Sequence, residues 1–313
     1  MYVHVVPWTH IDPGSKSSYT NAFNTHITKI ITSVVSALEA KPTRRFIWPE
    51  VCVLQRWYVA ANEELKASFR RVVSNGQFEI VTGGWVMADE TLTHYELLLD
   101  ELSEGHDWLQ RAIGAKPKVA FSVDAAGHSP VMSYMLKKSG MKGVVVNRIH
   151  YAYKKELAKS RALEFLWEPS WTTEENNRML THVLPFYSYD LSNTCGPDPR
   201  VCSKYDFTKV GKQTSWDDTV DPVTTENIRA FAADLADQYK KQARLFRNNH
   251  ILVLLGGNSY YETSSSIDTQ LTSYQSIFDH INADSSLNVR IAFSNLSNWF
   301  KTFNKPKKTQ TEK

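Results

Sequence analysis

Residues 1–14, MYVHVVPWTHIDPG, form an apolar run that ends in a histidine and a carboxylate just before a Pro-Gly turn. The valine-rich run predicts a buried strand, which places His10 and Asp12 at its carboxyl end. Because side chains two residues apart in a strand share a face, both groups can reach one ion. An imidazole and a carboxylate suit zinc, and the alternative interpretation is a strand-end polar pair that is satisfied by backbone groups.

Strands and helices alternate along the rest of the sequence. Apolar residues at helical spacing predict a first helix within 20–42, and a short strand follows at 46–48. Further strands are expected at 78–85, 118–124, 142–149, 163–169, 182–190, 250–258 and 289–294, and further helices at 56–74, 94–114, 130–140, 228–249 and 274–282. Apolar strands that alternate with helices predict an α/β fold, with a mainly parallel sheet that is either open or closed as a barrel.

The composition is typical of a globular chain. Of its 313 residues, 42% are hydrophobic, which is enough to build a large core. The net charge is +3 with both signs interspersed, so we expect no nucleic-acid partner. No apolar run reaches membrane-spanning length and no leader precedes the first strand, so we expect neither a membrane span nor a secretory signal in this chain.

Polar side chains gather where the predicted strands end. In a mainly parallel α/β fold, the functional site lies at the carboxyl ends of the strands. The residues expected at this edge are His10, Asp12, Glu50, Asp89, Glu90, Asp124, Arg148, Asp190 and Asn258. Individual members, such as the Asp89-Glu90 pair, also fit helix capping. A histidine, several carboxylates and an arginine at one edge are the groups that a metal-assisted hydrolase of a polar substrate requires.

The three cysteines divide into a pair and a single residue. Cys195 and Cys202 lie in one proline-constrained loop, TCGPDPRVC, whereas Cys52 stands apart after a predicted strand. We hypothesise that the pair forms a disulfide, because the two cysteines share this constrained loop. The cysteine spacings do not match those of zinc fingers, so we expect no metal role for these thiols. A disulfide would indicate an oxidising compartment, in tension with the missing leader.

Several longer motifs resemble one enzyme family. WPEVCVLQRWY (48–58), GQFEIVTGGWVMADE (76–90), SVDAAGHSP (122–130) and PFYSYDLSNTCGPDPRVC (185–202) resemble glycoside hydrolase family 38, the class II α-mannosidases, and the last is most similar to the Golgi α-mannosidase II branch. The resemblance implies a seven-stranded, mainly parallel β/α barrel-like catalytic domain over 1–303, followed by a charged tail at 304–313. It also implies zinc, an α-mannoside or N-glycan substrate, retaining hydrolysis, and residence in the Golgi or secretory-pathway lumen.

The resemblance assigns roles to individual residues. His10 and Asp12 match two zinc ligands, and Asp124 matches the carboxylate that both contacts zinc and attacks the anomeric carbon. The role of Asp124 suits a retaining glycosidase, in which one carboxylate is the nucleophile. The residues that match the lining of the sugar site are Arg148, Tyr189 and Asp190.

The same motifs also depart from the family pattern. Ser15 stands where the family has an aromatic platform for the sugar, and Asp124 is followed by two alanines rather than by Pro-Phe. Asn258 stands at the position of the general acid/base, and an amide cannot exchange that proton. The family's fourth zinc ligand lies in a His-His-Asp motif beyond the barrel. We expect this chain to end before it, and to lack the helical bundle and β-sandwich that follow.

These departures leave three hypotheses. The chain is an α-mannosidase that is impaired or truncated and holds zinc weakly or in part. Alternatively, it is a non-catalytic mannose- or glycan-binding pseudoenzyme. A more distant alternative is a metal-dependent deacetylase, since a histidine and an aspartate at a strand end serve that chemistry too. Metal content and glycan binding would separate the three.

Overall fold

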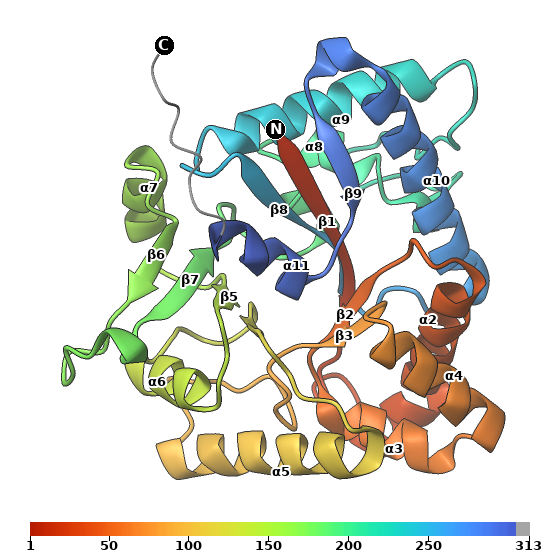
Figure 1. The fold of residues 1–313 in the computed structure, drawn as a ribbon. Coiled ribbons are helices and arrows are strands. Elements are labelled where there is room, and N and C mark those ends of the chain that lie inside the picture. Colours follow the sequence, from red (N-terminus) through yellow and green to blue (C-terminus); the bar gives the residue numbers. More distant parts are fainter. Residues whose placement is uncertain (305–313) are drawn as a thin grey trace.

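The computed structural model describes residues 1–304, which form two mainly parallel sheets flanked by helices (Figure 1). The expected α/β architecture is therefore confirmed. The predicted charged tail lies outside the described residues, apart from its first position. Within residues 1–304, no helix is both long and apolar enough to cross a membrane.

The first sheet is built around β1 (Tyr2–His10), and all of its strand pairs are parallel. Its order is β3-β2-β1-β8, and β9 also pairs with the first half of β1. The other strands are β2 (Phe46–Trp48), β3 (Phe78–Ile80), β8 (His250–Asn258) and β9 (Arg290–Phe293). The register of β1 with β8 runs from Tyr2 opposite His250 to His10 opposite Asn258. Both long strands therefore end at the same level.

The second sheet has the order β4-β5-β7-β6. Its strands are β4 (Ala120–Ser122), β5 (Val144–Val146), β6 (Glu164–Trp167) and β7 (Met179–Val183). All pairs are parallel except β6 with β7, which is antiparallel. The expected strand at 182–190 ends at Val183, so the segment that carries Tyr189 is a loop rather than a strand.

The two sheets meet at Thr82. Its backbone N–H donates to the carbonyl of Val119 over 2.9 Å, and its hydroxyl accepts from the backbone N–H of Phe121 over 2.8 Å. Thr82 and Gly83 both have positive φ, at 58° and 76°, which turns the chain out of the strand conformation. The residues described here thus form nine strands in two sheets rather than one continuous seven-stranded sheet, because this turn replaces a ladder between β3 and β4.

Side chains from both sheets fill the space between them. Trp8 on β1 is fully buried and packs edge-on against Phe121 of β4, with ring centroids 4.8 Å apart. Ile47, Val145 and Leu254 of other strands belong to the same buried cluster. This shared interior fixes the two sheets relative to each other, although few hydrogen bonds join them.

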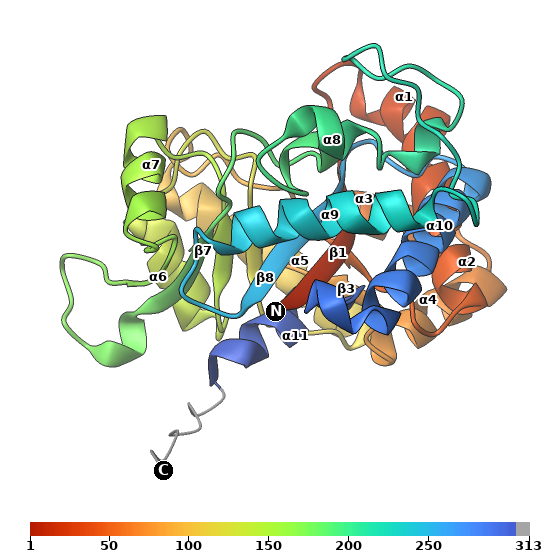
Figure 2. The same cartoon turned by 90° about the horizontal axis from the view of Figure 1, so that it is seen from above.

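Helices cover the outer faces of both sheets, as Figure 2 shows from above. They are α1 (Tyr19–Ala22), α2 (Thr28–Ala40), α3 (Val51–Ala60), α4 (Glu63–Ser74), α5 (Tyr95–Ile113), α6 (Pro130–Lys138), α7 (Tyr151–Lys159), α8 (Pro199–Ser203), α9 (Ile228–Ala243), α10 (Ser264–Ala283) and α11 (Leu296–Phe300). A π-helical turn, Phe23–Ile27, joins α1 to α2. The helix expected at 56–74 is two helices, because Asn62 caps α4 by accepting from the backbone N–H of Leu65.

The hypothesised disulfide between Cys195 and Cys202 is present. Both cysteines are buried, and the bond ties α8 to the loop that follows Asp190. Cys52 is a buried free thiol on α3.

Candidate metal and sugar site

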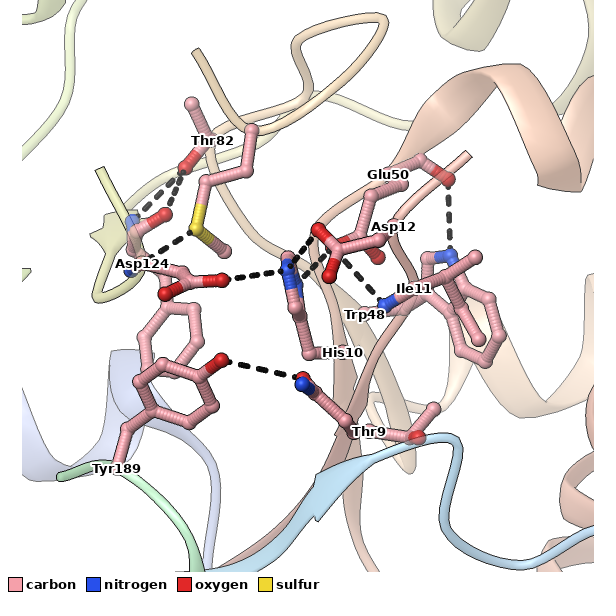
Figure 3. A network of polar contacts seen from close by, with 12 residues as sticks. Thr9, His10, Ile11, Asp12, Trp48, Glu50, Thr82, Asp124 and Tyr189 are labelled. Carbon is pink, nitrogen blue, oxygen red and sulfur yellow. Dashed lines mark hydrogen bonds and ion pairs between the residues drawn. The ribbon is translucent and has the colours of Figure 1, made fainter. Parts of the chain in front are cut away.

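His10 is the centre of the candidate site. It is the last residue of β1 and is 3% exposed. Its Nε2 lies 2.8 Å from Oδ1 of Asp12 and 3.1 Å from Oδ2 of Asp124 (Figure 3). Asp12 comes from the loop after β1 and Asp124 from the loop after β4, so the two sheets together build the cluster. The three predicted metal ligands are therefore brought together, with their ligand atoms within 4.8 Å of one another.

The other ring nitrogen of His10 is held by a residue from a third loop. Nδ1 lies 2.8 Å from Oε1 of Glu50, which sits between β2 and α3 and has no exposed surface. A buried carboxylate on one ring nitrogen favours the tautomer that carries its proton there. With an ion bound, Nε2 would present its lone pair on the side of the two aspartates.

This donor set fits a zinc ion. One imidazole nitrogen and two carboxylate oxygens are ordinary zinc ligands, and three protein ligands are typical of catalytic zinc sites. A histidine ligand usually donates its second N–H to a carboxylate, as His10 does to Glu50. The side chain of Asp12 is 44% exposed, which leaves one side of the cluster open to solvent.

The charged groups of the cluster shift the pKa values of one another. Burial lowers the pKa of His10, but hydrogen bonds to Asp12, Asp124 and Glu50 outweigh it and raise the pKa to about 12. For Asp124, burial raises the pKa, whereas His10 and Arg148 lower it and prevail. Asp124 is therefore ionised at neutral pH. In the absence of an ion, a proton on His10 balances part of the negative charge.

Arg148 and Tyr189 reach the same carboxylate from the second sheet. The guanidinium of Arg148 donates to Oδ1 of Asp124 and lies 6.0 Å from the centre of the Tyr189 ring. Tyr189 is buried, and its hydroxyl donates to Oδ1 of Asn258 over 3.1 Å. The structure thus brings two of the three predicted sugar-site residues next to Asp124.

Asp190, the third predicted sugar-site residue, makes side-chain and backbone hydrogen bonds within its own loop, and its side chain lies beside Gly257 of β8. Its Oδ1 accepts from the side-chain amide of Asn193 over 2.9 Å, and its carbonyl accepts from the hydroxyl of Thr194. Its local role is to shape the turn that leads to the disulfide.

Asn258 ends β8 opposite His10. The preceding Gly256 has a φ of 150°, and a Cβ there would lie 1.8 Å from the carbonyl oxygen of Trp8. This close approach requires glycine. It brings the end of β8 tightly onto β1, so that the exposed amide of Asn258 faces the hydroxyl of Tyr189.

The loop that carries Asp124 is braced by two acidic residues. Glu90 is buried and accepts from the hydroxyl of Ser122 over 2.7 Å and from the backbone N–H of Ser129 over 2.9 Å, so it joins both ends of the loop. Asp89 accepts from the backbone N–H of Ala126 over 2.7 Å. The helix-capping interpretation of this pair is wrong, because His94 is the N-cap of α5 and the side chains of Asp89 and Glu90 bond to the Asp124 loop instead.

Sequence reasoning missed two features of this neighbourhood. Glu50 was expected only as one of several polar residues at the strand ends, and its position directly after β2 was the available signal. His128 was not singled out at all. Its Nδ1 lies 3.3 Å from Glu90, and its side chain is 4% exposed.

One cavity adjoins the cluster, and a second is lined by its neighbours Arg148 and Tyr189. The first, of about 340 Å³, lies beside His10 and Asp12, and its lining includes Ser15, His26, Asn258 and Glu262. The other, of about 700 Å³, has a lining that includes Arg148, Tyr151, Lys154, Tyr187 and Tyr189. Because Ser15 is short, it leaves the first cavity without an aromatic wall.

Residues 1–312 match the model of the glycosyl hydrolases family 38 N-terminal domain. The chain belongs to glycoside hydrolase family 38. Among family 38 relatives, it is 40% identical to α-mannosidase 2x of Mus musculus over 303 residues, which cover 96% of the chain and 26% of that protein. It is 38% identical to α-mannosidase 2 of Homo sapiens over 316 residues, which cover the whole chain and 28% of that protein.

A solved α-mannosidase structure has the same fold. The α-mannosidase from Enterococcus faecalis V583 superposes with a TM-score of 0.68, at 14% identity, over 98% of this chain and 30% of that one. The chain thus spans between a quarter and a third of the length of these relatives.

Proposed function

We propose that this chain is a retaining α-mannosidase domain in which residues 1–303 form the catalytic unit and Asp124 is the nucleophile. The observation that carries the proposal is the position of Asp124. Its carboxylate is 14% exposed and lies between the guanidinium of Arg148 and Nε2 of His10. These two groups keep the carboxylate ionised and fix its direction, as a nucleophile in a retaining glycosidase requires.

The ion would be held by His10, Asp12 and Asp124. A zinc ion bound there acts as a Lewis acid that orients the sugar hydroxyls. We propose weak or partial zinc occupancy, because the side chain of Asp12 is 44% exposed.

Cleavage of a glycosidic bond to a sugar needs an ionised nucleophile and a second group that donates a proton to the leaving oxygen. Asp124 attacks the anomeric carbon as a carboxylate, and the bond to the leaving oxygen breaks with both electrons on that oxygen. A sugar leaving group then requires a proton, which Asn258 cannot donate. A nitrophenolate leaves without one. Residual activity is therefore directed to aryl α-mannosides, and this chain is an impaired member of the N-glycan-processing class.

The proposal includes a location in the lumen of the secretory pathway. Relatives named α-mannosidase 2 and the buried disulfide both support a secretory-pathway lumen, such as that of the Golgi, since disulfides persist in oxidising compartments. The natural substrate would be an α-mannoside or a mannose-bearing N-glycan.

The test compares two substrates. The 313-residue chain should release nitrophenol from nitrophenyl α-mannoside slowly and leave a mannose-rich N-glycan untrimmed, and Asp124→Ala should abolish the nitrophenol release. Glycan trimming at a rate typical of glycosidases, abolished by Asp124→Ala, would contradict the impaired state. Nitrophenol release that survives in Asp124→Ala would contradict the nucleophile.

A second candidate is a glycan-binding pseudoenzyme, and the amide at Asn258 favours it. In that case a mannose-terminated glycan would bind to the chain with no release of nitrophenol from the aryl mannoside. Family membership favours glycosidase chemistry over the deacetylase alternative.

A further inference from the structure

We propose that Glu50 is a positioning residue of the metal site, which holds Nδ1–H of His10 and thereby directs Nε2 at the point shared by Asp12 and Asp124. The inference rests on the metal site of the proposed function. It concerns a residue that contacts neither the ion nor the sugar, and it assigns the buried carboxylate a role in metal affinity.

The contact is short and fully buried. Oε1 of Glu50 lies 2.8 Å from Nδ1 of His10, and the two residues are 0% and 3% exposed. Oε1 is also 3.5 Å from the backbone N–H of Ile11. Oε2 has no hydrogen-bond partner within residues 1–304. The imidazole is therefore the main partner of this carboxylate, and a buried carboxylate without such a partner is costly.

The backbone around Glu50 is rigidly held. The indole N–H of Trp48 donates to the carbonyl of Glu50 over 2.8 Å, and the backbone N–H of Val51 donates to the carbonyl of Gly84 over 3.1 Å. Glu50 also immediately precedes α3. Because the backbone of Glu50 is held in place, its side chain can define the orientation of the imidazole.

The orientation matters because a histidine has two nitrogens and a rotatable ring. When Nδ1 keeps its proton on Glu50, Nε2 is the ligand atom and already lies within 3.1 Å of both aspartates. Without the carboxylate, both tautomers and other ring rotations become accessible, and binding must first select one of them. Removal of such outer carboxylates usually costs 10- to 100-fold in metal affinity.

A purely structural role for Glu50 is the competing explanation, since it also approaches the backbone of Ile11. Two substitutions separate the roles. Glu50→Gln keeps an acceptor oxygen but removes the charge, whereas Glu50→Leu removes both. Glu79→Gln is the matched control. Its carboxylate accepts from the backbone N–H groups of Leu296 and Ser297 at the start of α11, away from the cluster.

The experiment measures the zinc affinity of the full chain by competition with a chelator, with zinc ions as the only ligand. We expect the Kd to rise about 10-fold in Glu50→Gln and up to about 100-fold in Glu50→Leu, and to stay unchanged in Glu79→Gln. Denaturation in excess chelator checks that each variant is folded. Equal zinc affinity in the wild type and in both folded Glu50 variants overturns the proposal.

A second measurement needs no variant. Nitrogen-15 NMR of the zinc-loaded wild-type chain should show His10 protonated at Nδ1 and bound to metal through Nε2, and metal at Nδ1 overturns the proposal. A wild-type chain that binds no zinc overturns the metal site together with the role of Glu50. Zinc binding with the expected Glu50 effects, but without glycosidase activity, supports the role of Glu50 and contradicts only the proposed activity.

Discussion

His10 and Asn258 lie directly opposite each other at the ends of β1 and β8. Thr9 of β1 holds the end of β8 in place. Its hydroxyl donates to the carbonyl of Gly257 over 3.2 Å and accepts from the backbone N–H of Tyr260 over 2.9 Å. The candidate metal ligand and the expected acid position are therefore placed by one strand pair. A carboxylate at position 258 would reach the site without any rearrangement of the backbone.

Asn258→Asp tests whether the missing acid is the main defect. The hydroxyl of Tyr189 donates to Asn258, and the same hydrogen bond to an aspartate would lower the pKa of the new carboxyl and keep it ionised. Ser15 would still leave the sugar without an aromatic wall. We expect N-glycan trimming to gain less than ~10-fold, against the 10² to 10⁴ that general acid catalysis typically contributes.

Single-turnover trimming of a mannose-rich glycan measures this gain, and Asn258→Ala is the control without a carboxylate. Recovery by more than ~100-fold in the single variant would show that the acid alone was missing.

Zinc content tests the predicted ligand set. After dialysis, elemental analysis should find less than one zinc per chain, and Asp12→Ala or Asp124→Ala should remove it, because each leaves only two of the three converging ligands. Asp190→Ala is the control, since the side chain of Asp190 bonds within its own loop. One tightly held zinc in both ligand variants would place the site elsewhere.

The buried Lys154 should make the free energy of unfolding depend on pH. It is 8% exposed, and within residues 1–304 its ammonium donates to two neutral groups, the side-chain carbonyl of Asn147 and the backbone carbonyl of Phe186. Burial lowers the pKa of Lys154 from 10.5 to about 8. Between these values the unfolded state binds more protons, so the free energy of unfolding rises with pH by up to about 3 kcal/mol.

Urea denaturation at pH 7.5 and 10 checks this prediction by comparing the wild type with Lys154→Met. The difference in unfolding free energy between the two should move in favour of the wild type at the higher pH. Lys155→Met, an exposed neighbour on α7, should follow the wild type at both values. A pH-independent difference for Lys154→Met would mean that the buried amine has an ordinary pKa.

The disulfide predicts a labelling pattern and a loss of stability. Under denaturing, non-reducing conditions only Cys52 should react with a thiol reagent, since Cys195 and Cys202 are bonded to each other. The bond closes a loop with a sequence separation of 7, and its removal should cost about 2 to 3 kcal/mol in unfolding free energy.

Denaturation of a double Cys195→Ser, Cys202→Ser variant measures that cost, with Cys52→Ser as the control for a buried thiol. Full labelling of three cysteines in protein from an oxidising compartment would contradict the bond.

The sequence determined the elements of this protein and the local part of its site. Alternating apolar segments predicted most of the strands and helices, because burial on both faces requires wholly apolar strands. They did not predict the loop that replaces most of the expected strand at 182–190, or the break between α3 and α4. The pairing of His10 with Asp12 was also local, since the extended backbone presents residues two apart on one side. The resemblance to family 38 was visible in the sequence because each motif is a contiguous stretch of residues. The match of residues 1–312 to the family model confirmed it.

Only the tertiary structure decided which distant groups meet His10. Glu50 reaches Nδ1 from the loop after β2, and Asp124 approaches Nε2 from the second sheet. No spacing in the sequence distinguishes these carboxylates from Asp190, whose side chain accepts a hydrogen bond within its own loop. The division into two sheets likewise depends on the left-handed backbone at Thr82, a residue type that rarely adopts it. Long-range packing decides such features, because it selects one arrangement among many that local preferences allow.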